Sequence, residues 1–263
     1  MPTWPAMFPV LCDLDGVVWL AHQPIAGSVD AIARLRSAGH RVLFVTNNSS
    51  ARVAAQEDAL ARIGIEAVGD VLTSAMAAAQ LVQPGERAMV CGSDGIVEAL
   101  EQRGVQVVDS PDVDAVVVGW HRTFDYAGLT RAATAVMRGA RLIGTNDDAT
   151  YPTPDGPIPG GGSILAAVRT ASGVEPLVAG KPHEPMAALV RATVGAEAAL
   201  MAVMVGDRPS TDGLFAVTLG CRYAHVQSGV TPAGTIVEPP PDIEAPDLAG
   251  VADVIVAGHL NGG

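Results

Sequence analysis

The sequence predicts an α/β protein with a Rossmann-like parallel-sheet core that is interrupted by a second, smaller α/β section. Short apolar runs alternate with amphipathic stretches from residue 10 to residue 63, which implies right-handed crossovers between parallel strands. The alternation starts again near Pro84, and core-like strands return after residue 176. We therefore expect a core domain of residues 1–76 and 177–263, with an inserted second α/β domain of residues 77–176.

Each core element has a local signal. A short apolar run beginning at Val10 predicts a buried first strand, because it is too short for a helix. A helix is expected from Ser28, a capping residue, to the stop at Gly39. The remaining core expectations are strands at 41–45, 71–73, 176–179, 201–205, 222–226 and 254–256 and helices at 51–63, 74–82 and 184–194.

The inserted section has its own alternation of strands and helices. Strands are expected at 87–91, 105–108, 115–119 and 141–144, and helices at 96–103, 126–138 and 163–172. The segment 145–162 is a long loop with four prolines and three consecutive glycines. Long loops inside compact domains are usually functional or disordered, and the proline content of this loop favours function.

The composition indicates which binding partners and which cellular compartment to expect. The 263 residues include 28 acidic and 16 basic side chains, and this net charge of −12 disfavours nucleic acid as a partner. The three cysteines are widely spaced in apolar surroundings, as expected of reduced thiols. No basic-then-apolar leader and no run of about eighteen apolar residues is present. We expect a cytoplasmic protein without a membrane partner.

Polar side chains follow several of the predicted strands. If these strands share one parallel sheet, their carboxyl ends lie along a single edge. The residues concerned are Asp13, Asp15, Thr46, Asn47, Lys181, Asp207 and Asp212. Carboxylates that converge there would repel one another without a cation, and oxygen-only ligands favour a hard ion such as Mg²⁺.

The remaining groups at this edge suit a phosphoryl group. A hydroxyl, a backbone N–H and one ammonium supply the donors that its three oxygens need. Lys181 is the only lysine beside fifteen arginines, which indicates that a guanidinium would not serve at this position. The nucleophile is then an aspartate, acting through an aspartyl-phosphate intermediate.

Four motifs in this order resemble the haloacid dehalogenase (HAD) superfamily of phosphatases. They are Asp13-x-Asp15-Gly16, Val45-Thr46-Asn47-Asn48-Ser49, Gly180-Lys181-Pro182 and Gly206-Asp207-Arg208-x-x-Thr211-Asp212. The resemblance covers nearly the whole chain. The inserted section is most similar to the group with a large α/β (C2-type) cap, which includes NagD-like, 4-nitrophenylphosphatase, phosphoglycolate, pyridoxal phosphate and glycerol 3-phosphate phosphatases.

The resemblance assigns roles to the first two motifs. It makes Asp13 the nucleophile and Asp15 the general acid, with the Asp13 side chain and the Asp15 carbonyl also on Mg²⁺. The Thr46 hydroxyl and the Asn47 N–H would hold phosphoryl oxygens.

The resemblance also assigns the last two motifs. Lys181 would neutralise carboxylate and phosphate charge, Asp207 would ligate the metal directly, and Asp212 would act from beyond the inner coordination sphere. The family usually has other residue types at positions 209, 210 and 213, where this chain has Pro, Ser and Gly. That departure leaves the start of the following helix in question.

The cap is expected to choose the substrate. The segment 145–152 matches the family's cap loop that faces the active site, which makes Tyr151 and Asp148 substrate-binding candidates. His121 stands where an acidic residue is expected, and a lone loop histidine is more often structural. The expected partner is a small phosphorylated metabolite such as glycerol 3-phosphate, phosphoglycolate, a nucleoside monophosphate or a sugar phosphate. A homodimer formed through the cap is left open.

Three alternative functions share part of this residue set. A receiver-type phosphoacceptor needs no second domain and no Asp15. A dehalogenase lacks the second aspartate and has no use for Mg²⁺. A non-hydrolytic phosphate-ester binding protein on the same fold would be expected to have lost a motif residue, whereas all are present here.

Overall fold

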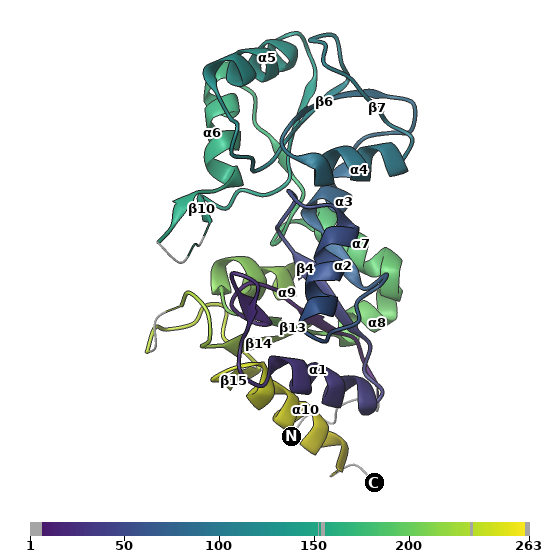
Figure 1. Cartoon of the computed structure of the whole chain (residues 1–263), viewed down its shortest axis with the longest axis vertical. Helices are drawn as coiled ribbons and strands as arrows, with labels where there is room; N and C mark the ends of the chain where they lie inside the picture. The colour runs from purple at the N-terminus through teal and green to yellow at the C-terminus, as the bar shows by residue number, and fades with distance from the viewer. Residues whose placement is uncertain (1–6, 152, 154–155, 232–233, 261–263) are drawn as a thin grey trace. The chain divides into compact units, whose positions relative to one another are not determined.

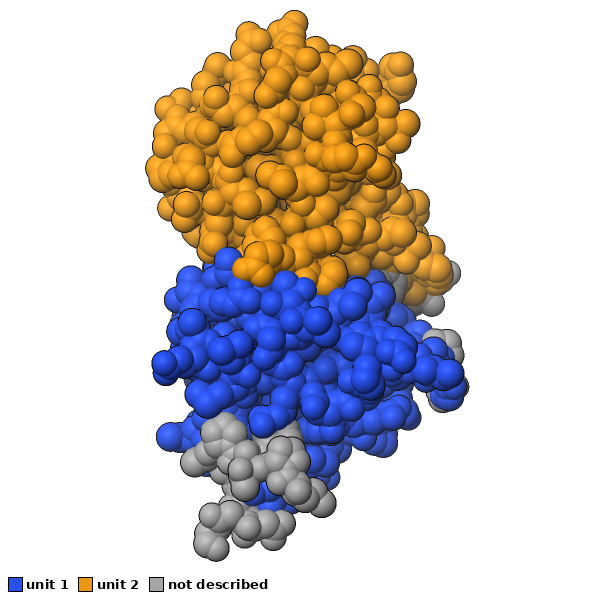
Figure 2. Space-filling view, turned by 180° about the vertical axis from the view of Figure 1, so that it is seen from behind, with its two compact units in different colours: residues 1–45, 56–72, 187–263 blue, residues 46–55, 73–186 orange. Residues whose placement is uncertain are grey.

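The chain folds into two compact units in the computed structural model, which describes residues 7–151, 153, 156–231 and 234–260. The first unit contains residues 1–45, 56–72 and 187–263, and the second contains residues 46–55 and 73–186 (Figure 2). The extreme N-terminal residues, on which the expectation of no leader depended, lie outside the described part. Within that part, no helix combines the length and the apolar character needed to cross a membrane.

The first unit is built on a six-stranded sheet with the order β15-β14-β13-β1-β4-β5. Its strands are β1 (Val10–Cys12), β4 (Val42–Thr46), β5 (Val71–Thr73), β13 (Val203–Gly206), β14 (Arg222–Val226) and β15 (Ile243–Ala245). Strand β1 pairs in parallel with β4 and with β13, and strand β14 pairs in parallel with β13 and with β15. The central strands β1, β4 and β13 are buried along their whole length, as expected of a sheet that is covered on both faces.

Helices and one hairpin complete the first unit. The helices are α1 (Ser28–Ser37), α2 (Val53–Arg62), α7 (Glu184–Val194), α8 (Ala196–Met201), the π-helix η1 (Pro209–Gly213), α9 (Leu214–Leu219) and α10 (Leu248–Leu260). Strands β2 (Trp19–Leu20) and β3 (Gln23–Pro24) form the hairpin. Helices α1 and α10 pack side by side (Figure 1), and Arg34 of α1 bonds Asp253 of α10. Helix α9 packs on β13 and β14.

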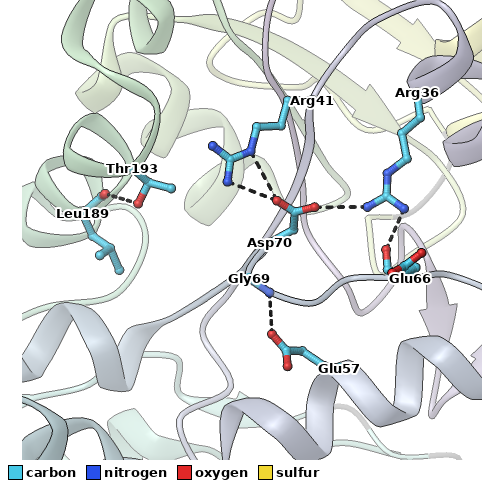
Figure 3. A network of polar contacts seen from close by, with 8 residues as sticks. All are labelled: Arg36, Arg41, Glu57, Glu66, Gly69, Asp70, Leu189 and Thr193. Carbon is cyan, nitrogen blue, oxygen red and sulfur yellow. Dashed lines mark hydrogen bonds and ion pairs between the residues drawn. The ribbon is translucent and has the colours of Figure 1, made fainter.

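A polar network fixes the segment that leads from α2 into β5 (Figure 3). The Asp70 carboxylate accepts from Arg41 at 3.2 Å and from Arg36 at 3.4 Å. The Gly69 N–H donates to Glu57 at 2.8 Å. Such exposed ion pairs contribute little stability individually, so the network mainly sets the path of the chain into the edge strand.

The second unit has a five-stranded sheet with the order β12-β9-β8-β6-β7, and all of its pairings are parallel. Its elements are α3 (Ser74–Ala79), β6 (Arg87–Cys91), α4 (Asp94–Gln102), β7 (Gln106–Val107), β8 (Ala115–Val118), α5 (Tyr126–Met137), β9 (Arg141–Gly144), α6 (Gly161–Ser172) and β12 (Leu177–Val178), with a hairpin of β10 (Thr150–Tyr151) and β11 (Ile158–Pro159). Helices α5 and α6 pack together over β6, β8 and β9 and bury an aliphatic core.

The predicted fold class, a parallel α/β core with a second α/β section, is confirmed. Two element predictions are wrong. The strand expected to return to the core sheet at 176–179 is β12, which pairs with β9 in the second sheet. Residues 254–256 are helical within α10, because the buried positions Leu248, Val251, Ala252 and Ile255 recur with helical spacing.

Candidate functional site

Three carboxylates meet at the carboxyl ends of two neighbouring strands in the first unit. Asp13 follows β1, and its N–H donates to the Val205 carbonyl of β13 at 2.9 Å. Asp207 directly follows β13, and Asp212 lies in η1. One oxygen from each of these three aspartates lies within 4.8 Å of the others. The sheet therefore brings together the three acidic side chains that the sequence placed at one edge.

Two glycines confine the Asp207 carboxylate. A Cβ at Gly16 would lie 2.6 Å from Cγ of Asp207, and a Cβ at Gly229 would lie 1.9 Å from its Oδ2. The same Oδ2 accepts the Val230 N–H at 2.7 Å. Asp207 thus occupies a slot that only glycine can line, which fixes the direction in which its carboxylate points.

The loop after β14 supports this slot, and the sequence alone did not identify it. The Ser228 hydroxyl donates to the Gly16 carbonyl at 2.6 Å, and the Thr231 hydroxyl donates to the Asp207 carbonyl at 2.6 Å. A run of Ser, Gly and Thr directly after a predicted core strand is the same kind of signal as the four motifs, and it could have revealed the loop.

Asp212 is held over the last residue of β13. A Cβ at Gly206 would lie 2.2 Å from Cγ of Asp212. The Asp212 Oδ2 accepts the Arg208 N–H at 3.2 Å. Pro209 is the first residue of the π-helix that carries Asp212, and π-helical turns are frequent at functional sites. The unusual Pro209 and Gly213 therefore do not prevent a helical turn from presenting Asp212.

Asp15 lies in the tight turn between β1 and the β2–β3 hairpin. It forms an isolated bridge with Trp19, and the Gly16 N–H donates to the Trp19 carbonyl at 2.8 Å. Gly16 has a φ of 88°, a conformation that favours glycine. The bend that Asp13 and Asp15 need in order to act differently is thus present immediately after them.

The donor set of the cluster suits a hard divalent cation. It offers only carboxylate oxygens, and two of its three members, Asp207 and Asp212, are buried. Buried carboxylates at this separation are mutually unfavourable without a compensating charge. Oxygen ligands in small number, with room for water, are the preference of Mg²⁺.

A second group of predicted residues meets inside the second unit. The side-chain amide of Asn47 exchanges two hydrogen bonds with the Lys181 backbone, at 2.8 and 3.0 Å. The Asn47 Nδ2 also donates to the Asp148 Oδ2 at 2.9 Å. The structure therefore brings together Asn47, Asp148 and Lys181, which are separated by up to 134 residues along the chain.

Lys181 is almost completely buried, with 1% of its surface exposed. The residue before it, Gly180, admits no side chain, since a Cβ there would lie 2.5 Å from Oδ1 of Asn47. Thr46 ends β4 and is also buried, and its hydroxyl accepts the Asn48 N–H at 3.0 Å. A buried ammonium is costly unless negative groups compensate it, so Lys181 has the environment of a functional cation rather than a surface lysine.

Two further side chains orient the Asn47 peptide, and the sequence alone did not single them out for this. The Asn146 Nδ2 and the Ser74 hydroxyl both donate to the Asn47 carbonyl, at 2.9 and 2.8 Å. Asn146 belongs to the predicted cap loop, where a run of polar residues could have indicated a functional role. Ser74 has no such sequence signal, because it stands at the start of an ordinary helix.

Tyr151 lies in an aromatic group of the second unit. Its ring stacks on Trp120 with 5.3 Å between ring centroids, and the Arg122 guanidinium lies 5.5 Å from the Trp120 ring centre. The Trp120 indole N–H donates to the Pro159 carbonyl. Residues 152 and 154–155 of this predicted loop lie outside the described part.

Two histidines lie near these predicted residues. His121 contacts the Cys91 sulfur at 3.7 Å and Thr123 at 3.2 Å, and burial lowers its pKa. These contacts agree with a structural role. His183 bonds Asp147 at 3.1 Å, and this hydrogen bond lowers the pKa of the Asp147 carboxyl.

A parallel α/β unit with a carboxylate cluster at its strand ends defines a class of metal-binding α/β enzymes. Comparison with known families specifies the class. The family model described as haloacid dehalogenase-like hydrolase matches residues 10–106, and a second family model for HAD-like hydrolases matches residues 178–251. The chain belongs to the haloacid dehalogenase-like hydrolase family.

Relatives and solved structures agree with this placement. The chain is 39% identical over 233 residues to D-glycerol 3-phosphate phosphatase of Mycobacterium tuberculosis, covering 85% of this chain and 64% of that protein. It is 34% identical to an acid sugar phosphatase of Staphylococcus saprophyticus, covering 84% and 86% of the two chains.

Among solved structures, the glycerol phosphate phosphatase of M. tuberculosis in complex with magnesium matches with a TM-score of 0.85 and 35% identity, over 94% of this chain and 76% of that one. A p-nitrophenyl phosphatase of Archaeoglobus fulgidus matches with a TM-score of 0.88 and 28% identity, over 95% and 100%.

Proposed function

We propose that the protein hydrolyses small phosphomonoesters with Mg²⁺, through a phosphoryl intermediate on Asp13. The observation that carries the proposal is the cluster of Asp13, Asp207 and Asp212, whose ligand oxygens lie within 4.8 Å of one another. Three relatives carry names of the same kind of activity: D-glycerol 3-phosphate phosphatase, acid sugar phosphatase and 5'-nucleotidase.

The proposed chemistry has two displacements at phosphorus. An Asp13 carboxylate oxygen attacks the phosphorus, the bond to the ester oxygen breaks, and protonated Asp15 gives its proton to the leaving alkoxide. A water molecule then attacks the same phosphorus and loses a proton to Asp15. The Asp13–phosphorus bond breaks, which releases inorganic phosphate and restores both carboxyl groups.

Thr46, Asn47 and Lys181 would hold the phosphoryl group during both displacements. The Thr46 hydroxyl and the Asn47 N–H each supply a donor. Asn47 fixes the Lys181 backbone through its paired hydrogen bonds, which supports a set position for the ammonium. Positioning and charge stabilisation are the main protein contributions to phosphoryl transfer.

Asp13, Asp207 and the Asp15 carbonyl would hold Mg²⁺, with Asp212 acting through bound water. When bound, the ion neutralises charge that the carboxylates and the phosphate share. The buried position of Asp207 and the backbone donors at Asp207 and Asp212 support this assignment.

The substrate would be chosen by the cap, which we place at residues 77–176 together with β12 (Leu177–Val178) of the same sheet, with the rest of residues 1–76 and 177–263 as the core. Tyr151 and Asp148 are the proposed substrate-binding residues. Glycerol 3-phosphate, phosphoglycolate, sugar phosphates and nucleoside monophosphates are the candidate substrates. A homodimer through the cap and a cytoplasmic location belong to the same proposal.

A phosphate-release screen over these esters, with Mg²⁺ and with excess chelator, tests the proposal. We expect Mg²⁺-dependent release from at least one of them. A stable phosphoprotein without turnover would instead favour a phosphoacceptor. Binding without phosphorylation would favour a phosphate-ester binding protein.

A further inference from the structure

Strand β14 carries two buried polar side chains beside the carboxylate cluster. Tyr223 and His225 are 3% and 2% exposed. Among the described residues, the Tyr223 hydroxyl and both ring nitrogens of His225 have no hydrogen-bond partner. Because the two residues are two apart on a strand, their side chains face the same side of the sheet. Buried polar groups are nearly always satisfied by protein, water or ions, so these groups require an explanation.

The Tyr223 ring lies against the turn that carries Asp212. A Cβ at Gly213 would lie 3.0 Å from Cε1 of Tyr223, and Gly213 directly follows Asp212 in η1. The sheet register gives a second link. His225 is the register partner of Gly206, and partners on neighbouring strands point their Cβ atoms to the same side of the sheet. A Cβ on Gly206 would point at Asp212, so the His225 and Tyr223 side chains lie on the Asp212 side.

The electrostatic environment agrees with this position. Burial raises the pKa of Tyr223, and the negative charges of Asp212 and then Asp207 raise it further. The phenol consequently stays protonated near neutral pH, and its neutral oxygen can accept a hydrogen bond from a water molecule.

We propose that Tyr223 is a positioning residue of the metal site, whose hydroxyl oxygen accepts a hydrogen bond from a metal-bound water on the Asp212 side. Mg²⁺ usually keeps several of its waters in protein sites, and these waters supply the donor that the described residues do not offer to this hydroxyl. Groups in this outer position commonly change metal affinity 10- to 100-fold when they are removed. The inference rests on the proposed metal site.

A purely structural role is the competing explanation. The Tyr223 and His225 rings are 6.1 Å apart between centroids, so the hydroxyl could share a water with His225 alone. In that case its removal would lower stability in the absence of metal and leave metal affinity unchanged.

Calorimetric titration of Mg²⁺ into substrate-free Tyr223→Phe distinguishes these roles, with Tyr126→Phe as the matched control. Tyr126 is 84% exposed on α5 of the second unit, so the control loses the same hydroxyl from a solvent-exposed side chain. We expect the Mg²⁺ dissociation constant to rise about tenfold in Tyr223→Phe and to stay within twofold of wild type in the control. A Tyr223→Phe constant within twofold of wild type would overturn the inference.

Two further measurements keep the test decisive. If Tyr223→Phe does not fold, the wild-type chain is titrated with Mg²⁺ while its tyrosine ultraviolet difference spectrum is recorded. A perturbation that both Tyr126→Phe and Tyr151→Phe retain supports the inference, because Tyr223 is the remaining tyrosine, and a spectrum without any tyrosine signal contradicts it. If the wild-type protein binds no Mg²⁺, both the proposed metal site and the Tyr223 role are overturned. If the wild-type protein binds Mg²⁺ and Tyr223→Phe binds it equally well, only the Tyr223 role is overturned.

Discussion

Gly16 and Asp207, which are distant in sequence, fit together so closely that no side chain can stand at position 16. A Cβ there would lie 2.6 Å from Cγ and 2.7 Å from Oδ2 of Asp207. The φ of 88° at Gly16 is a separate reason for glycine. The residue that ends the first motif therefore shapes the metal-ligand slot as well as the turn.

Gly16→Ala should damage both stability and metal binding. Gly85 has a similar positive φ of 86°, and a Cβ there would meet nothing within 4 Å, so Gly85→Ala is a control for a positive φ without a close contact. We expect Gly16→Ala to be less stable than Gly85→Ala by at least about 1 kcal/mol because of overpacking, and to bind Mg²⁺ about tenfold more weakly. Urea denaturation and calorimetry measure the two quantities. Equal behaviour of the two variants would show that the close approach to Asp207 has no consequence.

Lys181→Arg should not preserve activity. The site is buried, and a compact ammonium fits where a planar guanidinium needs a wider setting. We expect kcat/KM to fall at least about a hundredfold, or roughly 2.7 kcal/mol of transition-state stabilisation. Lys181→Ala should be only modestly worse. Steady-state rates on one good substrate, at matched thermal stability, measure the effect, and near-normal kinetics in both variants would refute the role.

Tyr151→Ala should change the order of substrate preference. Tyr151 stacks on Trp120 in the proposed cap, so its removal would alter the proposed substrate-selecting region without changing the proposed phosphate-binding residues Thr46, Asn47 and Lys181. We expect kcat/KM on 4-nitrophenyl phosphate to change less than the values on larger natural esters. Tyr126→Ala, at an exposed site, is the control. If every ester slowed by one common factor, Tyr151 would be a packing residue.

Stability should fall at alkaline pH partly through Cys91. Burial raises the pKa of its thiol from 9.0 to about 11, so the folded state keeps a proton that the unfolded state loses. The stabilising contribution is therefore complete below about pH 9 and disappears as pH rises through 11, with a slope of at most about 1.4 kcal/mol per pH unit. Denaturation of wild type and Cys91→Ala at several pH values between about 8 and 10.5 measures this slope. Identical slopes would contradict it.

The acidic cluster could be predicted because its signals are local. Asp13 and Asp207 each directly follow a short buried strand, and Asp212 comes five residues after Asp207 in η1. Parallel topology places such strand ends along one edge. The loop of Ser228 and Gly229 has the same kind of sequence signal, and its contacts with Gly16 and Asp207 show what the loop supports. The sequence gives no indication of a role for Tyr223, because a tyrosine in an apolar strand is usually a packing residue. Only the structure shows that its hydroxyl is buried without a partner among the described residues.

The two wrong elements show what short apolar runs cannot specify. The run at 254–256 satisfies a strand pattern, whereas the helix is visible only over the whole stretch from Leu248. The strand at 176–179 was recognised, but the sheet that it joins depends on its pairing with β9. That choice rests on long-range packing and has no local sequence signature.

The most direct test of the central claim is hydrolysis of 4-nitrophenyl phosphate by wild type and Asp13→Asn, each with Mg²⁺ and with excess chelator. An amide at position 13 cannot form the acyl phosphate. We expect wild-type turnover only with Mg²⁺, and loss of turnover in Asp13→Asn with an unchanged circular dichroism spectrum and melting temperature. Wild-type-like rates in Asp13→Asn, or full activity in chelator, would contradict the account.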